Sequence, residues 1–388
     1  MDASEAAGAG GRPGLALAAA IATVSMVGVG LSLSMALLSV RLAEAGYSAR
    51  AIGLNPAAGG LATLAIATFV PRLARWLGVR SLLFLALLAA VLSLAAFALY
   101  ENYWAWLLVR GFYGAALTVL FVLSEFWINT VAPPKKRGII LGLYTTSLAA
   151  GFAAGPTILA LTGTRGLPPF LAAIALFLVA AVPVALVGGQ APELEQQAKT
   201  SLRSFLTVAP VATLAALIYG AIETAGMSLL PVYALRNGME AETGALLVSL
   251  FALGNVIFQI PMGLLSDRYD RRRLLRINAA AGLLGALALS FAGGMPFAIF
   301  ASLLVVWGGV VGSLYAIGLA HLGARYQGAE LAGANATYIM LYSVGMLAGP
   351  PFLGVGLDLA PSGLFLAIAA MLAAYLTIAS WRIETAHS

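Results

Sequence analysis

Long apolar runs recur from one end of the chain to the other, and they constrain its fold more than any other feature. A helix needs about 20 apolar residues to cross the hydrocarbon core of a bilayer. Of 388 residues, 61% are hydrophobic and only 9% are charged, too few to cover a soluble protein of this length. We therefore predict an all-α membrane protein with about twelve transmembrane helices. The expected spans are 14–40, 51–70, 81–100, 103–130, 138–162, 167–188, 205–235, 241–262, 275–293, 296–320, 329–356 and 361–381.

Basic residues are distributed unevenly between the two sides that these spans define. With both termini placed in the cytoplasm, most of the 21 Lys and Arg residues fall in cytoplasmic segments, as membrane proteins prefer. The sequence therefore predicts a multi-pass protein of the cell inner (plasma) membrane, surrounded by the lipid bilayer, with both termini cytoplasmic. The same bias accounts for the net charge of +6 without a nucleic-acid partner.

A polar stretch divides the spans into two sets of six. We expect an N-terminal bundle over residues 1–190, a cytoplasmic linker over 191–204 and a C-terminal bundle over 205–388. The two halves share a string at a constant offset of 194 residues, which indicates two pseudo-symmetric six-helix bundles, a common transporter architecture. The repeated residues are Tyr144, Gly151, Gly155 and Pro156 in the first half and Tyr338, Gly345, Gly349 and Pro350 in the second.

Four local strings resemble the major facilitator superfamily of secondary transporters. Gly263–Leu275 is similar to its cytoplasmic loop signature, and Leu107–Gly114, with Arg110 followed by Gly114, to its fourth-span motif. Gly151–Pro156 resembles the fifth-span motif of drug–proton antiporters without the trailing glycine pair, and Ser124–Asn129 resembles a string of a poorly characterised bacterial branch. The resemblance covers essentially the whole chain and implies a twelve-helix protein that works by alternating access. We expect a monomer.

Three charged residues within expected spans are candidates for proton or substrate coupling. Arg110 lies about 10 Å inside the outer end of its span, where it either takes part in coupling, as the resemblance implies, or braces the helix. Glu223 lies near the midplane with Tyr219 one turn away, and it is either the proton site or a protonated packing residue. Glu125 either lines the inner vestibule and relays protons or forms a gate ion pair.

Two further groups of residues complete the predicted site. Asn255 and Gln259 share one helix face and either line a substrate cavity or form interhelical hydrogen bonds. Asp267, with Arg268, Arg271 and Arg272, forms either a cytoplasmic gate or a charge cluster that only sets topology. We expect Gly114 and the repeated glycines and prolines to serve close helix packing.

Several classes of function are excluded by composition. The chain has no cysteine and only two histidines, His321 and His387, so thiol chemistry is absent and a metal centre is not expected. No phosphate-binding G-x-x-x-x-G-K-[ST] string and no nucleophile–base constellation occurs. We therefore expect neither an enzyme nor a cofactor.

The function predicted from the residues and the resemblance is secondary active transport of a small organic solute, coupled to protons, with efflux slightly favoured. The alternative is a non-transporting membrane receptor or scaffold on a transporter fold. Intramembrane charges favour transport, because a chain released from that function would lose such costly residues first. An organic cation, an amphiphilic drug and a neutral metabolite all fit the apolar spans with scattered amides and acids.

Overall fold

The computed structural model describes residues 13–67, 69–131, 137–187, 210–326 and 328–381, and these residues form helices and no strand. The expected linker 191–204 lies outside this range. The first set of helices is α1 (Pro13–Glu44), α2 (Ala49–Ala67), α3 (Val70–Leu77), α4 (Val79–Leu99), α5 (Tyr103–Val131), α6 (Arg137–Thr162) and α7 (Pro168–Leu186). The second set is α9 (Pro210–Arg236), α10 (Ala241–Arg268), α11 (Arg271–Phe291), the short 3₁₀ helix η3 (Ala292–Gly294), α12 (Phe297–Arg325), α13 (Gly328–Leu359) and α14 (Gly363–Trp381).

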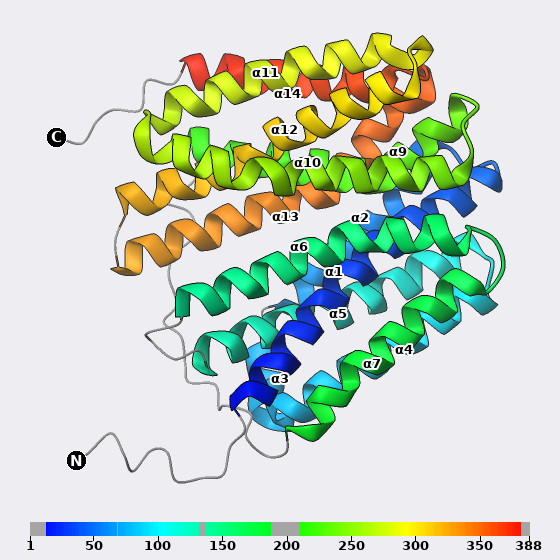
Figure 1. The fold of residues 1–388 in the computed structure, drawn as a ribbon, viewed down its shortest axis with the longest axis vertical. Helices are drawn as coiled ribbons and strands as arrows, with labels where there is room; N and C mark the ends of the chain where they lie inside the picture. Colours follow the sequence, from blue (N-terminus) through cyan, green and yellow to red (C-terminus); the bar gives the residue numbers. More distant parts are fainter. Residues whose placement is uncertain (1–12, 68, 132–136, 188–209, 327, 382–388) are drawn as a thin grey trace.

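The two sets of helices form two halves that lie one against the other (Figure 1). Between the halves, α2 packs on α13, α6 packs on α10, and α1 packs on α9. Helices of the two halves lie side by side at one end and diverge toward the end that carries both chain termini (Figure 1). We call the latter the terminal end. The opposite end, which carries the short connections 45–48, 163–167, 237–240 and 360–362, is the turn end.

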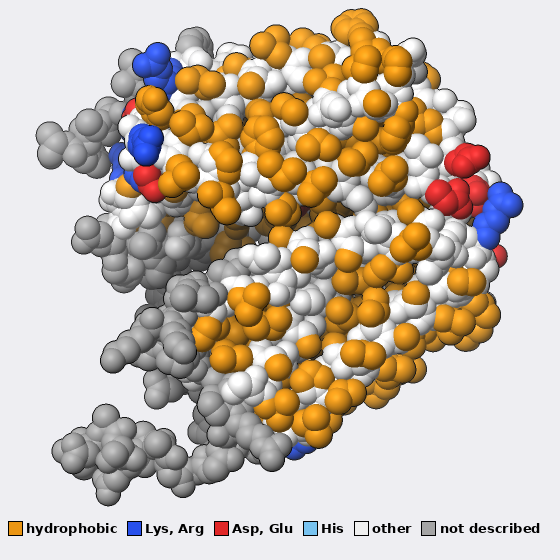
Figure 2. All heavy atoms as spheres, in the orientation of Figure 1, with side chains coloured by type: hydrophobic (Ala, Val, Ile, Leu, Met, Phe, Trp, Pro, Cys, Tyr) orange, Lys and Arg blue, Asp and Glu red, His pale blue; other side chains and the backbone are white. Residues whose placement is uncertain are grey.

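The outer surface has the hydrophobic belt that a bilayer requires. Ten helices in the described residues are long and apolar enough to cross a membrane, or eleven if α2 and α3 count as one bent span, and α6 adds a shorter apolar stretch. On the visible face, hydrophobic side chains cover the middle and charged side chains gather toward the two ends (Figure 2). Leu88 and Val179 are 54% and 67% exposed, as expected for side chains that face lipid.

Repeated glycines allow equivalent helices to approach closely in both halves. A Cβ on Gly151 or Gly155 of α6 would collide with the backbone of α1. The counterparts on α13, Gly345 and Gly349, abut the backbone of α9 in the same way. Gly114 of α5 lies equally close to the backbone of α2 at Gly59. Small residues at these positions let helix backbones touch, which is how helices gain van der Waals contact in a membrane.

The structure differs from the expected loop after the second span, because residues 70–77 form the helix α3. Pro71 occupies the first turn of this helix, where its missing N–H costs nothing, and Gly78 ends it with a positive φ of 79°. Val70 and Ala74 are buried whereas Trp76 is 82% exposed, so α3 presents an apolar face to the N-terminal half. A sequence search for long apolar runs overlooks a helix as short and basic as this one.

The Gly263–Leu275 string is likewise mostly helical instead of a loop. α10 continues to Arg268, and α11 begins at Arg271, which leaves only two residues between them. Asp270 caps α11, because its side chain accepts a hydrogen bond from the backbone N–H of Arg273 at 2.7 Å.

Candidate functional site

A carboxylate surrounded by tyrosines occupies the interior of the C-terminal half. Glu223 lies near the middle of α9, and its Oε1 accepts a hydrogen bond from Tyr219 Oη at 2.8 Å. Tyr342 Oη on α13 donates to the other carboxylate oxygen. Asn255 Nδ2 on α10 donates to Tyr219 Oη, at 2.5 Å. Three helices therefore converge on one half-buried carboxylate, and both of its oxygens are hydrogen-bonded.

Ring packing holds these tyrosines in place. The ring centroids of Tyr219 and Tyr342 are 6.1 Å apart in a stacked arrangement, and Tyr315 of α12 lies 5.7 Å from the first and 5.3 Å from the second. Aromatic pairs at such separations add about 0.5–1.5 kcal/mol beyond the area they bury. We call Glu223, Tyr219, Tyr315, Tyr342 and Asn255 the tyrosine cluster.

Sequence reasoning identified part of this cluster and missed the rest. Tyr219 and Glu223 were paired in the prediction because they are four residues apart on one helix. Tyr342 and Tyr315 were missed, although Tyr342 lies one turn after Tyr338, a residue of the repeated string. Asn255 was predicted beside Gln259, but the structure separates them, since Asn255 joins the cluster whereas the Gln259 side chain is exposed.

Arg110 is the buried charge of the N-terminal half. It lies on α5, is only 1% exposed, and donates from Nη1 to Ser34 Oγ of α1 at 2.7 Å. Its guanidinium carbon also lies 5.9 Å from the ring centroid of Tyr113. In the described part of the chain, Nη2 has no hydrogen-bond partner and no ion pair includes Arg110. A buried guanidinium with an unused donor can bind an acceptor that enters the site.

Glu125 lies on the same helix, about four turns beyond Arg110, and its side chain is exposed. It is within electrostatic range of Tyr144 in its own half and of Tyr315 in the tyrosine cluster. The neighbouring Ser124 Oγ lies 3.1 Å from Tyr144 Oη. A gate partner for Glu125 was expected in the basic loop that follows α5, and residues 132–136 of that loop lie outside the described residues.

The predicted gate residues lie at the terminal end, where α10 meets α11. Asp267 pairs with Arg271 at 3.4 Å, and the two side chains are 72% and 27% exposed. Arg268 is exposed and Arg272 is partly exposed at the same junction. Among the described residues, no group of three or more His, Cys, Asp or Glu side chains could hold a metal ion.

Comparisons with known proteins agree with the helical architecture and identify the family. The chain matches the Major Facilitator Superfamily over residues 15–246 and 212–387. It is 30% identical over 321 residues to the Bacillus subtilis (strain 168) protein named "Uncharacterized MFS-type transporter YfkF", with 81% of each chain covered. It is also 22% identical over 260 residues to "Uncharacterized MFS-type transporter YcaD" of Escherichia coli (strain K12 / DH10B), covering 66% of this chain and 67% of that protein.

Solved transporter structures share the fold at low sequence identity. The nucleoside transporter NupG matches with a TM-score of 0.76 and 16% identity, covering 94% of this chain and 98% of NupG. A D-xylose-proton symporter matches with a TM-score of 0.71 and 15% identity, covering 95% and 96%. The expected all-α fold is therefore confirmed, and the relatives are transporters instead of enzymes. Its helices, its repeated packing and its relatives together show that this chain belongs to the Major Facilitator Superfamily of secondary transporters.

Proposed function

We propose that this protein couples the movement of a small organic solute to protons by alternating access, with Glu223 as the proton-carrying residue. The observation that carries the proposal is the tyrosine cluster. In it, a carboxylate in the middle of a membrane span accepts hydrogen bonds from tyrosine hydroxyl groups on two helices. An ionisable residue at such depth is costly, and proton relays are a recurrent reason for one.

The cluster can stabilise both protonation states of Glu223. The ionised carboxylate accepts hydrogen bonds from the two tyrosines, whereas the neutral acid can donate its own proton to a tyrosine oxygen. Tyr342 lies on α13, which also packs on α2 of the other half. A movement of the halves against each other therefore changes the surroundings of Glu223, and a change in hydrogen bonding or hydration is what loads or releases a proton.

Other predicted residues take supporting roles in this proposal. Arg110, with its unused Nη2 donor, binds a substrate or intermediate acceptor. Glu125 lines the vestibule and relays protons toward the tyrosine cluster, and Asn255 orients Tyr219. Asp267 with Arg268, Arg271 and Arg272 acts as a gate at the terminal end.

The proposal places the terminal end, with both termini, in the cytoplasm. The bias of Lys and Arg toward that side supports this orientation. Because the halves meet at the turn end and diverge toward the terminal end, the conformation described is then inward-facing. The resemblance of Gly151–Pro156 to an antiporter string favours efflux over import in this proposal. The protein works as a monomer. An impermeant thiol reagent should label Asp270→Cys only from inside, a clean assay in a cysteine-free chain.

Transport itself is tested with purified protein in liposomes that enclose a pH-sensitive dye. A thermal-shift screen of metabolites and drugs first identifies a stabilising compound, since a ligand that binds the folded state raises its melting temperature. We expect this compound to drive proton movement across the liposome membrane. Binding without any movement of solute or protons would support the receptor reading instead.

A further inference from the structure

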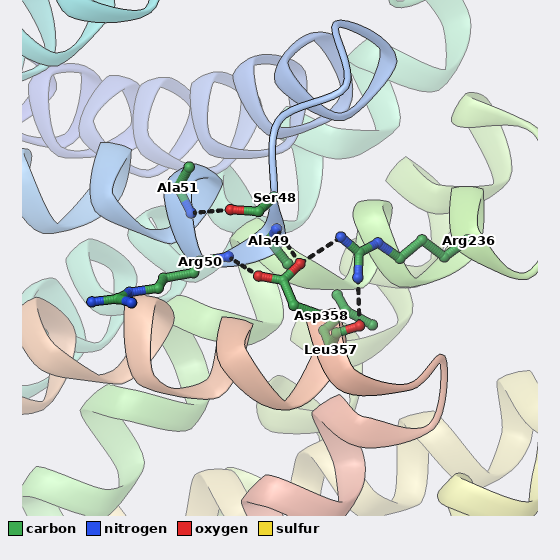
Figure 3. Close-up of polar contacts among 7 residues, drawn as sticks. All are labelled: Ser48, Ala49, Arg50, Ala51, Arg236, Leu357 and Asp358. Carbon is green, nitrogen blue, oxygen red and sulfur yellow. Dashed lines mark hydrogen bonds and ion pairs between the residues drawn. The ribbon is translucent and has the colours of Figure 1, made fainter.

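We propose that Asp358 is a latch that holds the two halves together at the turn end. This proposal rests on alternating access as proposed above, but it concerns a different part of the molecule from the tyrosine cluster. Asp358 lies in the last turn of α13, far from the predicted gate at Asp267, and sequence reasoning assigned it no role. Its carboxylate contacts the first turn of α2, in the opposite half (Figure 3).

Both carboxylate oxygens of Asp358 bind the N-terminus of α2. Oδ1 accepts a hydrogen bond from the backbone N–H of Ala49 at 2.7 Å, and Oδ2 accepts one from Arg50 N–H at 2.9 Å. These N–H groups have no acceptor within their own helix, and the helix dipole adds attraction for a negative charge. The next N–H, of Ala51, is bound locally by Ser48 Oγ at 3.2 Å. The N-terminus of α2 is therefore capped largely by the other half of the protein.

Arg236 holds the carboxylate in this position. It lies at the end of α9, and its Nη2 is 2.6 Å from Asp358 Oδ1, while Nη1 donates to the carbonyl of Leu357 (Figure 3). The side chains of Arg236 and Asp358 are 30% and 25% exposed, so the pair is partly shielded from water. A charge-assisted bond in such a site is stronger than a fully exposed ion pair.

Next to Asp358, the backbones of α2 and α13 are in direct contact. A Cβ on Gly354 of α13 would lie 2.6 Å from the carbonyl oxygen of Ala49, and Gly53 of α2 abuts the backbone of α13 at Pro350. The turn end cannot open without separating these surfaces and breaking both hydrogen bonds to Asp358. Asp358, Arg236 and the first turn of α2 form what we call the Asp358 latch.

The other half has an equivalent arginine, but a threonine occupies the position that corresponds to Asp358. Arg41 lies in the last turn of α1, as Arg236 does in that of α9, and its Nε donates to the carbonyl of Thr164 at 3.0 Å. Thr164 lies 194 residues before Asp358, the offset of the internal repeat. The corresponding helix start, that of α10, is preceded by Glu240, which makes no side-chain cap hydrogen bond. Among the described residues, both halves therefore have an arginine bound to a backbone carbonyl at this end, whereas the start of α2 is capped from the other half and the start of α10 has no side-chain cap.

Distances between spin labels test the latch without requiring transport. Label pairs on the two halves are Leu167→Cys with Glu242→Cys at the turn end, and Trp76→Cys with Tyr269→Cys at the terminal end, all at exposed positions. We expect Asp358→Ala to lengthen the first distance and shorten the second, with the ratio of the two conformations changed about ten-fold or more. Arg236→Gln should shift both distances in the same directions by less.

A matched control separates the latch from a general loss of surface charge. Glu101 pairs with Arg41 at 3.0 Å, but both belong to one half, so Glu101→Gln should leave both distances unchanged. Arg236→Gln serves as the decisive variant if Asp358→Ala does not fold. Folded variants with the distance distributions of the parent protein would overturn the latch. Shifted distances in a protein that moves no protons would support the latch and reject the proposed function.

Discussion

The two halves of this protein repeat their packing but not their buried charge. Arg110 in the N-terminal half has one hydroxyl partner and an unused donor, whereas Glu223 in the C-terminal half has both oxygens bonded to tyrosines. The position 194 residues after Arg110 is Leu304, a fully buried leucine on α12. At the offset of 195 that relates Arg41 to Arg236, Glu223 corresponds to Gly28, whose Cα packs on α6.

This difference shows which contacts the architecture demands and which it leaves free. Close helix contact is needed in both halves, so glycines recur at the same positions of α6 and α13. A buried charge adds nothing to that packing and is costly in a membrane. Arg110 and Glu223 each lack a charged counterpart in the other half, which points to a function that the two halves divide between them.

The largest expected effect is on coupling. Glu223→Gln should abolish proton-driven accumulation while substrate binding and downhill exchange persist, because glutamine resembles the neutral acid and cannot release a proton. Glu125→Gln should reduce transport less, and Glu242→Gln, at an exposed position of α10, should have no effect. The measurement is solute accumulation in liposomes under a proton gradient. Normal accumulation in Glu223→Gln with a loss in Glu125→Gln would move the proton site to α5.

A second prediction concerns the packing that the halves share. Gly345→Leu and Gly151→Leu should each destabilise the protein by about 3 kcal/mol, because the added side chain meets the backbone of the neighbouring helix. Unfolding of the purified protein in detergent measures both. Gly111→Leu is the control, since nothing lies within 4 Å of a Cβ there. A large loss from one glycine and none from the other would contradict equivalent packing.

A third prediction compares two tyrosine hydroxyl groups, one in each half. Tyr342→Phe removes one bond to the Glu223 carboxylate and should cost about 2 kcal/mol of stability together with part of the proton-driven accumulation. Tyr144→Phe removes a neutral contact to Ser124 and should cost about 1 kcal/mol with coupling intact. The same unfolding and accumulation assays measure both variants. Equal losses of accumulation would show that Tyr342 acts only through packing.

The smallest effect on stability is expected at the terminal end. Asp267→Asn removes an exposed ion pair with Arg271, worth about 0.5 kcal/mol, so melting should barely change. If Asp267 is a gate, the same variant should still lower transport and shift the spin-label distances toward inward-open, opposite to Asp358→Ala. Arg75 of α3, a charged residue of the first half, provides the comparison through Arg75→Gln. Unchanged transport and distances in Asp267→Asn would leave this charge only a role in topology.

The sequence predicted local features well because local geometry follows from the helix period. Tyr219 and Glu223 meet since residues four apart share a face, and the apolar runs mark the spans because a bilayer has a given thickness. Short elements were predicted poorly. Neither α3 nor the helical continuation of α10 to Arg268 stands out in hydropathy, because α3 has two arginines in eight residues and α10 ends on Asp267 and Arg268.

By itself, then, the sequence determined the all-α membrane class, the two repeated halves and the helix that carries the central acid. Only the tertiary structure decided which distant residues complete each site. Tyr342 is 119 residues from Glu223, and Asp358 is 309 residues from Ala49. Such pairs form because glycines bring particular helices into backbone contact at particular depths. That relative placement depends on packing between helices, which the hydropathy or periodicity of a single segment does not encode.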